Sequence, residues 1–206
     1  MQKSIWRNND QNGNHSVSKQ LIMGYSQWIQ RYIDHLGWNA FLMTFMFKPL
    51  KGNDGALMSQ MSDEVDRVYS TFLTRVVRKP TSDLLRYWDL SKYKIPVLVA
   101  VPDRPVVKRS KQSLKDVQIN NGLHMHGILV VPWQSRLRRD VVSQFQKDEK
   151  IYVKNRLLRL DVRPIQSNLG GVVDYAFKSI KTRKFDHDDI LVFPKSIAEL
   201  HEPSQI

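Results

Sequence analysis

The sequence of 206 residues contains no cysteine. Disulfide bonds, thiolate metal sites and a cysteine nucleophile are therefore excluded as explanations of its structure or chemistry. Apolar residues make up 41% of the chain, an ordinary share for a globular protein that argues against wholesale disorder. A chain of this length is sufficient for one domain with a hydrophobic core.

The chain also lacks a long apolar run, an apolar leader and a nucleotide-binding loop. No apolar segment reaches the roughly 20 residues of a membrane span. Residues 1–7 carry no apolar signal region, so we expect a protein that is not secreted and is cytoplasmic or nucleoid-associated. Because no G-x-x-x-x-G-K-[ST] loop is present, we expect no fused helicase, and any unwinding would require a separate helicase.

Acidic residues are scarce relative to basic residues, 20 against 32, which gives a net charge of +12. This imbalance favours a polyanionic partner, nucleic acid before a membrane surface. A basic protein without such a partner is the alternative, which the clustering of basic residues in 108–115, 136–139 and 178–184 weakens. The candidate nucleic-acid contacts are Lys108, Arg109, Lys111, Arg136, Arg139, Arg159, Arg163 and Lys181.

Hydrophobic periodicity predicts helices at 24–38, 58–79, 135–148 and 168–182, and strands at 39–47, 95–101, 123–132 and 154–165. Ser135 is the expected N-cap of the third helix. This order predicts an α+β fold, in which an antiparallel sheet carries helices on one face. We expect a flexible polar tail at 1–20, a single domain at 21–185 and a C-terminal tail at 186–206.

The strand at 154–165 alternates apolar and charged residues. One face is expected to hold Leu158, Leu160 and Val162, and the other Arg159, Asp161 and Arg163. The charged face is either plain solvent-exposed surface or a nucleic-acid face beside a metal site.

His124 and His126 begin the apolar run 123–132, which is typical of a buried strand. Residues two apart on a strand share a face, so these imidazoles can bind one metal ion. Two imidazoles with oxygen ligands suit Mn²⁺ better than Mg²⁺, and either divalent ion is a candidate. Packing at a strand end is the alternative for a pair of histidines taken alone.

The third ligand has several candidates. Asp103 follows the strand that is expected to pair with the histidine strand, and it has the same parity as Val99 and Val101. Gln118 and Asp116, in the loop just before the histidines, are rivals. A turn-forming role before Arg104 is an equal alternative for Asp103.

Tyr175 and Lys178 lie three residues apart in the last predicted helix, so they are expected to be neighbours on its surface. On a helical wheel, Tyr175 falls roughly 120° from the centre of the apolar stripe, and Lys178 falls nearly opposite that stripe. A phenol has a pKa near 10 and requires activation before it can act as a nucleophile. Lys178 can supply positive charge, and a metal ion can act as a Lewis acid on a phosphate.

The chain resembles the HUH endonucleases, the single-strand nicking enzymes of rolling-circle replication, conjugation and some transposition. The resemblance is carried by 41–45, similar to the family's first strand motif, by His124-Met125-His126, which matches its His-hydrophobic-His motif, and by Tyr175-Ala176-Phe177-Lys178, which matches its Y-x-x-K motif. The family often has a glutamate on the strand before the histidines, and none occurs between Ile95 and Leu123.

The resemblance implies a ferredoxin- or RRM-like sheet and the catalytic residues Tyr175 and Lys178. It implies a divalent metal at the histidines and site-specific nicking of single-stranded DNA, with a hairpin at an origin or element end as one form of target. The product would be a 5′-phosphotyrosine and a free 3′-hydroxyl. Such a step initiates rolling-circle replication or transfer of a mobile element, and the motifs do not separate the two.

Two other functions fit the same residues. A non-catalytic single-stranded nucleic-acid-binding module on the same kind of sheet would bind without a metal requirement. A metal-dependent phosphodiester hydrolase that uses water would require metal and form no covalent adduct.

Overall fold

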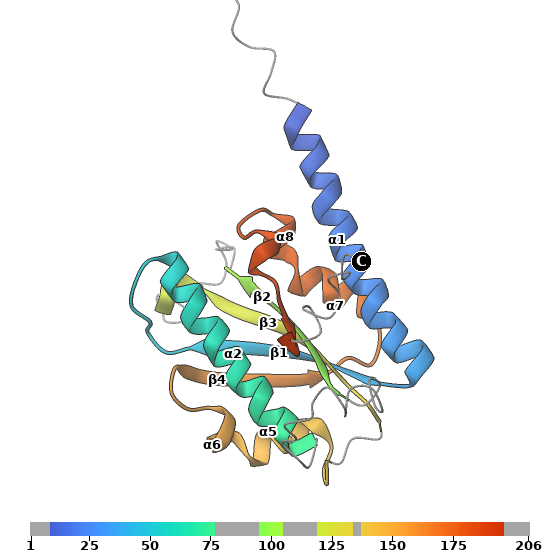
Figure 1. Ribbon diagram of the computed structural model, residues 1–206, viewed down its shortest axis with the longest axis vertical. Coiled ribbons are helices and arrows are strands. Elements are labelled where there is room, and N and C mark those ends of the chain that lie inside the picture. The colour runs from blue at the N-terminus through green and yellow to red at the C-terminus, as the bar shows by residue number, and fades with distance from the viewer. Residues whose placement is uncertain (1–8, 77–94, 105–118, 134–136, 196–206) are drawn as a thin grey trace, which may run out of the picture.

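The computed structural model describes residues 9–76, 95–104, 119–133 and 137–195, and they form one antiparallel sheet with helices around it (Figure 1). The five strands lie in the order β4-β1-β3-β2-β5. Their bounds are β1 Asn39–Phe47, β2 Val97–Asp103, β3 His124–Val131, β4 Leu157–Pro164 and β5 Leu191–Phe193. Every pair of neighbouring strands is antiparallel.

The helices are α1 Asn9–Leu36, α2 Asp54–Val76, α5 Val141–Lys147, α6 Glu149–Tyr152, α7 Leu169–Ala176 and α8 Lys178–Lys181, with 3₁₀ turns η1 Ile119–Gly122 and η2 His187–Asp189. The order β1-α2-β2-β3-α5-β4 is consistent with a ferredoxin-like fold. The predicted α+β class with an antiparallel sheet is confirmed.

Helices cover both faces of this sheet, whereas the sequence predicted them on one. Helices α2, α5 and α6 pack on one face, and α1, α7 and α8 pack on the other, which we call the site face (Figure 1). The central strands explain the second layer, since β2 is buried along its whole length and β3 along all but its first residue. Apolar residues on both faces of a strand require cover on both sides.

Gly127 of β3 has a packing role directly after the second histidine. It points away from the site face, and a Cβ there would lie 2.9 Å from Leu98 Cδ1 and 3.2 Å from a ring carbon of Phe45. The glycine lets side chains from β1 and β2 close over β3. The histidine strand is thereby held between its two neighbours.

The structure corrects the two predicted tails. Helix α1 begins at Asn9, inside the segment 1–20 that was predicted to be a tail. A helix nucleated by its packed part extends at small cost through residues that have no apolar period. In 186–206, β5 joins the sheet by pairing Phe193 with Leu98. Three residues are too short for a recognisable strand pattern.

Two local predictions also change. Helix α5 starts at Val141 and is capped by Asp140, whose side chain accepts from the Ser143 backbone N–H at 2.9 Å. The predicted cap, Ser135, lies outside the described residues. In β4, a register shift opposite Met46 and Phe47 buries Leu157 and leaves Leu158 46% exposed.

Among the helices of the described residues, none combines the length and apolar character that a membrane span requires.

Candidate metal centre and its tyrosine

The register of β2 and β3 brings three metal-ligand side chains together on the site face. Asp103, the last residue of β2, is paired with His124, and Val101 is paired with His126. Nε2 of His124 lies 3.2 Å from Nε2 of His126. Oδ2 of Asp103 lies 3.2 Å from Nε2 of His124 and 3.4 Å from Nε2 of His126. The end of β2 and the start of β3 therefore bring one oxygen atom and two nitrogen atoms to a common point.

The other nitrogen of each imidazole has its own partner. Nδ1 of His124 lies 2.8 Å from the Gly122 carbonyl oxygen, which can only accept, so we assign the proton to Nδ1. Nδ1 of His126 lies 3.2 Å from the Thr44 hydroxyl, which can donate or accept a hydrogen bond. Nε2 of His124 then carries a lone pair, and each imidazole has an outer partner at Nδ1, as metal-ligating histidines do.

A left-handed turn places the Gly122 carbonyl next to His124. Asn120, Asn121 and Gly122 have φ angles of 52°, 53° and 74°, values that Asn and Gly adopt more readily than other residues. The Asn120 side chain accepts from the Leu50 backbone N–H at 2.8 Å, which ties this turn to the end of β1. Asn-Asn-Gly is a turn signal in the sequence, but its role beside His124 was not predicted.

Asp103 is fully buried, with no exposed surface. Its Oδ1 accepts a hydrogen bond from the Ser179 hydroxyl, and its Oδ2 lies 2.6 Å from Nζ of Lys178. Burial would raise the pKa of Asp103, but hydrogen-bond donors at the carboxylate, Lys178 and Ser179 among them, outweigh burial and hold the pKa well below its ordinary value of 3.8. Asp103 is therefore a carboxylate at neutral pH.

Burial also lowers the pKa of His126 below its ordinary value of 6.5. The carboxylate of Asp103 opposes this shift, while His124 and Lys178 add to it. His126 is therefore held in the neutral form that binds metal ions.

These donors fit a divalent metal ion. Ligand atoms about 2.1 Å from one ion lie about 3.0–3.4 Å from one another at octahedral or tetrahedral angles. The three separations at the cluster fall within or close to that range. Oδ2 of Asp103 is a buried oxygen without a hydrogen bond of ordinary geometry. Asp103, His124 and His126 can therefore hold one divalent ion. The rivals Gln118 and Asp116 lie outside the described residues.

Tyr175 of α7 lies against this cluster and is 48% exposed. The centroid of its ring is 5.0 Å from that of His126 and 4.5 Å from Nζ of Lys178. An open cleft of about 260 Å³ is lined by Leu42, Thr44, His124, His126, Asp161, Arg163 and Tyr175. A ligand in this cleft would meet the tyrosine ring and the histidines together.

Helix α7 is capped by Asn168, whose side chain accepts from the Gly171 backbone N–H at 3.1 Å. The helix ends at Ala176, and Phe177, with φ −89° and ψ 9°, separates it from α8. The sequence placed Lys178 nearly opposite the apolar stripe, on the assumption of one straight helix. In the structure, Lys178 instead reaches the buried Asp103 while remaining beside Tyr175.

The predicted nucleic-acid contacts are dispersed. Arg159 and Arg163 of β4 are exposed, and Arg163 lines the cleft, where its guanidinium pairs with Asp161 at 2.8 Å. Lys181 pairs with Asp174 at 2.7 Å on the helix surface. Arg139 precedes α5, which packs on the face of the sheet away from the cluster. The remaining four, Lys108, Arg109, Lys111 and Arg136, lie outside the described residues.

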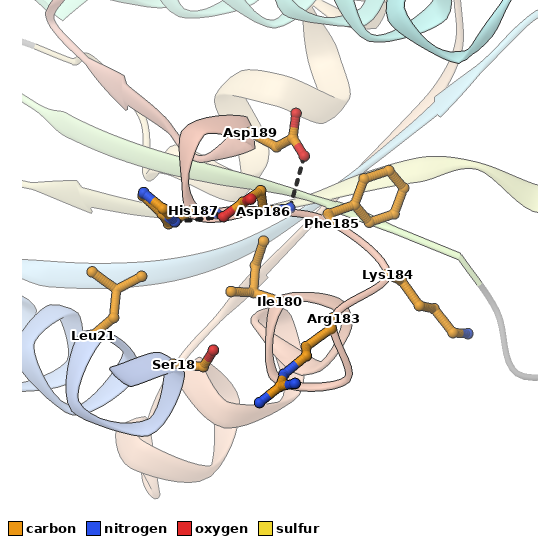
Figure 2. A pocket seen from close by; sticks show the side chains of 9 residues that line it. All are labelled: Ser18, Leu21, Ile180, Arg183, Lys184, Phe185, Asp186, His187 and Asp189. Atoms are coloured by element: carbon orange, nitrogen blue, oxygen red, sulfur yellow. Dashed lines mark hydrogen bonds and ion pairs between the residues drawn. The ribbon is translucent and has the colours of Figure 1, made fainter. Parts of the chain in front are cut away.

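A second hollow, of about 560 Å³, lies between α1 and the segment 180–189 (Figure 2). Its acidic groups cap η2: the Asp186 carboxylate accepts from the His187 backbone N–H at 2.7 Å, and the Asp189 carboxylate accepts from the Asp186 backbone N–H at 2.9 Å. These side chains serve the local turn. Within the described ranges, the group of three ligand-type side chains close enough to share one ion is the Asp103 cluster.

No protein-family model, no curated protein and no solved structure matches this chain. Function must therefore be inferred from the chemistry of the site.

Proposed function

We propose that the protein is a metal-dependent endonuclease that nicks single-stranded DNA at a specific site and rejoins or transfers the strand through a 5′-phosphotyrosine at Tyr175. The observation that carries this proposal is the position of Tyr175. A half-exposed tyrosine packs on a neutral histidine of a metal-type cluster, beside a lysine, at an open cleft. A tyrosine with only a packing role would bury its ring in the apolar stripe of its helix.

The reaction is a transesterification. The phenol of Tyr175 loses its proton, its oxygen forms a bond to phosphorus, and the bond from phosphorus to O3′ breaks. O3′ takes up a proton and leaves as the 3′-hydroxyl, while the 5′-phosphate stays on the tyrosine. One phosphodiester replaces another, so the 3′-hydroxyl of the same or another strand can reverse the step.

The chain's own residues have distinct tasks in this reaction. Lys178 supplies positive charge to the phenolate, since its Nζ lies 4.5 Å from the ring centroid. Asp103, His124 and His126 hold a divalent ion, Mn²⁺ or Mg²⁺, which supplies a Lewis acid for a non-bridging phosphate oxygen. Two imidazoles favour Mn²⁺.

The substrate proposal rests on the cleft and on the charge of the chain. Arg163 stands at the cleft with Tyr175 and the histidines, where a guanidinium suits a phosphate neighbouring the scissile one. The net charge of +12 favours a polyanion. In a cell, this activity would initiate rolling-circle replication or mobile-element transfer, with a separate helicase as partner.

The test is a search for a protein-linked product after incubation with labelled single-stranded DNA and Mn²⁺. The unmodified protein should form a covalent adduct, and peptide mass spectrometry should place the nucleotide on Tyr175. Tyr175→Phe, which keeps the ring and removes the phenol, should lower cleavage by on the order of 10³-fold or more and abolish the adduct. Tyr25→Phe is the matched control, because Tyr25 lies on α1 against Phe177, away from the cleft.

The outcomes separate the three functions. Metal-dependent cleavage that survives Tyr175→Phe and leaves no adduct would assign the reaction to a hydrolase that uses water. Binding of DNA without cleavage, with either metal, would identify a binding module.

A further inference from the structure

One oxygen atom of Asp103 faces three nitrogen groups. Oδ2 lies 3.2 Å and 3.4 Å from the two histidine Nε2 atoms, and 2.6 Å from Nζ of Lys178. The ammonium group therefore contacts the same oxygen that a metal ion would need. Lys178 neutralises a fully buried carboxylate, which would otherwise be costly to bury.

The carboxylate is fixed, whereas the lysine is able to move. Oδ1 of Asp103 accepts from the hydroxyl of Ser179, a residue only 1% exposed, and this hydrogen bond opposes rotation of the carboxylate toward an ammonium group that leaves. The Lys178 side chain is 33% exposed and has a flexible stem. Its Nζ already lies 4.5 Å from the ring centroid of Tyr175, so the phenol side chain is within its reach.

We propose that Lys178 and the metal ion compete for Oδ2 of Asp103, and that filling of the cluster transfers the Lys178 ammonium group to Tyr175. One carboxylate charge cannot balance a divalent ion and an ammonium group together in a buried site. The competition depends only on the metal cluster, whereas the transfer to the nucleophile rests on the proposed function. The consequence is an order of assembly, because the ammonium group leaves Asp103 for the phenol that it already borders only after the ion is in place.

The test measures metal affinity rather than activity. Mn²⁺ is titrated calorimetrically into protein that has been freed of metal with a chelator, with no DNA present. Lys178→Met, which keeps the length of the stem and removes the charge, should bind Mn²⁺ about tenfold more tightly than the unmodified protein. Lys178→Gln is a second neutral variant in case the first one fails to fold, and Lys178→Arg should bind like the unmodified protein.

Lys181→Met is the matched control. Lys181 lies on the same helix and pairs with Asp174 at 2.7 Å rather than with Asp103, so this variant removes one positive charge without touching the cluster. Its Mn²⁺ affinity should stay within roughly twofold of the unmodified protein, since exposed charges interact weakly. A gain shared equally by the Lys178 and Lys181 variants would be a general charge effect and would overturn the proposal.

Nuclear magnetic resonance supplies a second readout. In protein with labelled lysine, the Lys178 side-chain resonance is assigned by its loss in Lys178→Arg. This resonance should shift on addition of diamagnetic Zn²⁺, whereas the Lys181 resonance should not. The proposal is overturned if both neutral variants bind Mn²⁺ no more tightly than the unmodified protein. It is also overturned if the Lys178 resonance does not shift when the ion is added.

The two proposals fail separately. A protein that never forms the DNA adduct, while its Lys178 variants bind Mn²⁺ more tightly, retains the competition and loses the nuclease function. A protein that forms the adduct, while those variants bind Mn²⁺ no better, retains the nuclease function and loses the competition.

Discussion

Ser179→Ala removes the hydroxyl group that holds the metal-ligand carboxylate in place. Ser179 donates to Oδ1 of Asp103, and both side chains are buried. A hydrogen bond to a charged group contributes about 1.5–3 kcal/mol to stability. The Arg104 backbone N–H also contacts the Ser179 hydroxyl, at 3.3 Å, and adds less because this contact is long. We therefore expect the variant to lose about 2 kcal/mol in free energy of unfolding when no metal is present.

The same variant should bind metal more weakly, because outer partners orient the groups that contact the ion. Loss of such a partner lowers metal affinity by about 10- to 100-fold. Unfolding is measured by urea denaturation at neutral pH in the presence of a chelator, and metal binding by calorimetric titration with Mn²⁺. Thr182→Val is the matched control, because the Thr182 hydroxyl makes only a 3.4 Å contact with the Ser179 carbonyl oxygen and does not touch Asp103.

Two results together would refute this role of the hydroxyl. The free energy of unfolding of Ser179→Ala would lie within about 0.5 kcal/mol of that of the unmodified protein, and its Mn²⁺ affinity would be unchanged. Loss of stability without loss of metal affinity would mean that Ser179 only joins α8 to β2. An equal effect from Thr182→Val would assign the change to the helix end.

Two further predictions concern pH and DNA. Since burial lowers the pKa of His126 in the folded state below 6.5, the unfolded chain binds a proton first as the pH falls. The metal-free protein should therefore keep its full stability above about pH 6.5 and lose stability as the pH falls through the lower folded pKa. Urea denaturation at several pH values measures this dependence, which should be smaller in His126→Asn. Arg159→Ala combined with Arg163→Ala should weaken binding to an unstructured oligonucleotide and lower the salt slope by about 1–2, as measured by fluorescence anisotropy at several ionic strengths.

Each of these has a control within the chain. For His126, the comparison is His187→Asn, because His187 is exposed and lies on η2. If the pH dependence of stability were reduced equally in both variants, it would not come from the cluster. For the arginine pair, Lys19→Ala with Arg31→Ala removes the same charge from exposed positions of α1 that do not line the cleft. Equal weakening by both double variants would mean that binding follows net charge alone.

The sheet was predictable to the extent that its signals are local. The strand 39–47 has the bounds that the apolar run predicts. Parity along a strand placed Asp103 on the same face as Val99 and Val101, because side chains alternate whatever the partner strand is. The register that sets Asp103 opposite His124 is a property of two strands together, so the sequence left Gln118 as a rival.

The residues that the sequence analysis missed act across long chain separations. Thr44 reaches His126 from β1, and Ser179 reaches Asp103 from α8. A lone serine or threonine carries no spacing pattern, so only the packed structure identifies it. In the same way, the register shift in β4 reverses the expected burial of Leu157 and Leu158, because an extra residue breaks the alternation that the prediction assumes.

A structural role alone explains the buried Asp103 poorly. A buried ion pair is weak evidence for stability, since apolar residues of similar volume often serve as well. Apolar residues could replace the pair of Asp103 and Lys178 in this way, yet two imidazole Nε2 atoms also lie within 3.4 Å of the same carboxylate oxygen. With its proton on Nδ1, His124 turns the lone pair of Nε2 toward this oxygen, and a cation between the two atoms would relieve their repulsion. The geometry therefore favours a cation site, and the cleft that Tyr175 borders gives a substrate access to it.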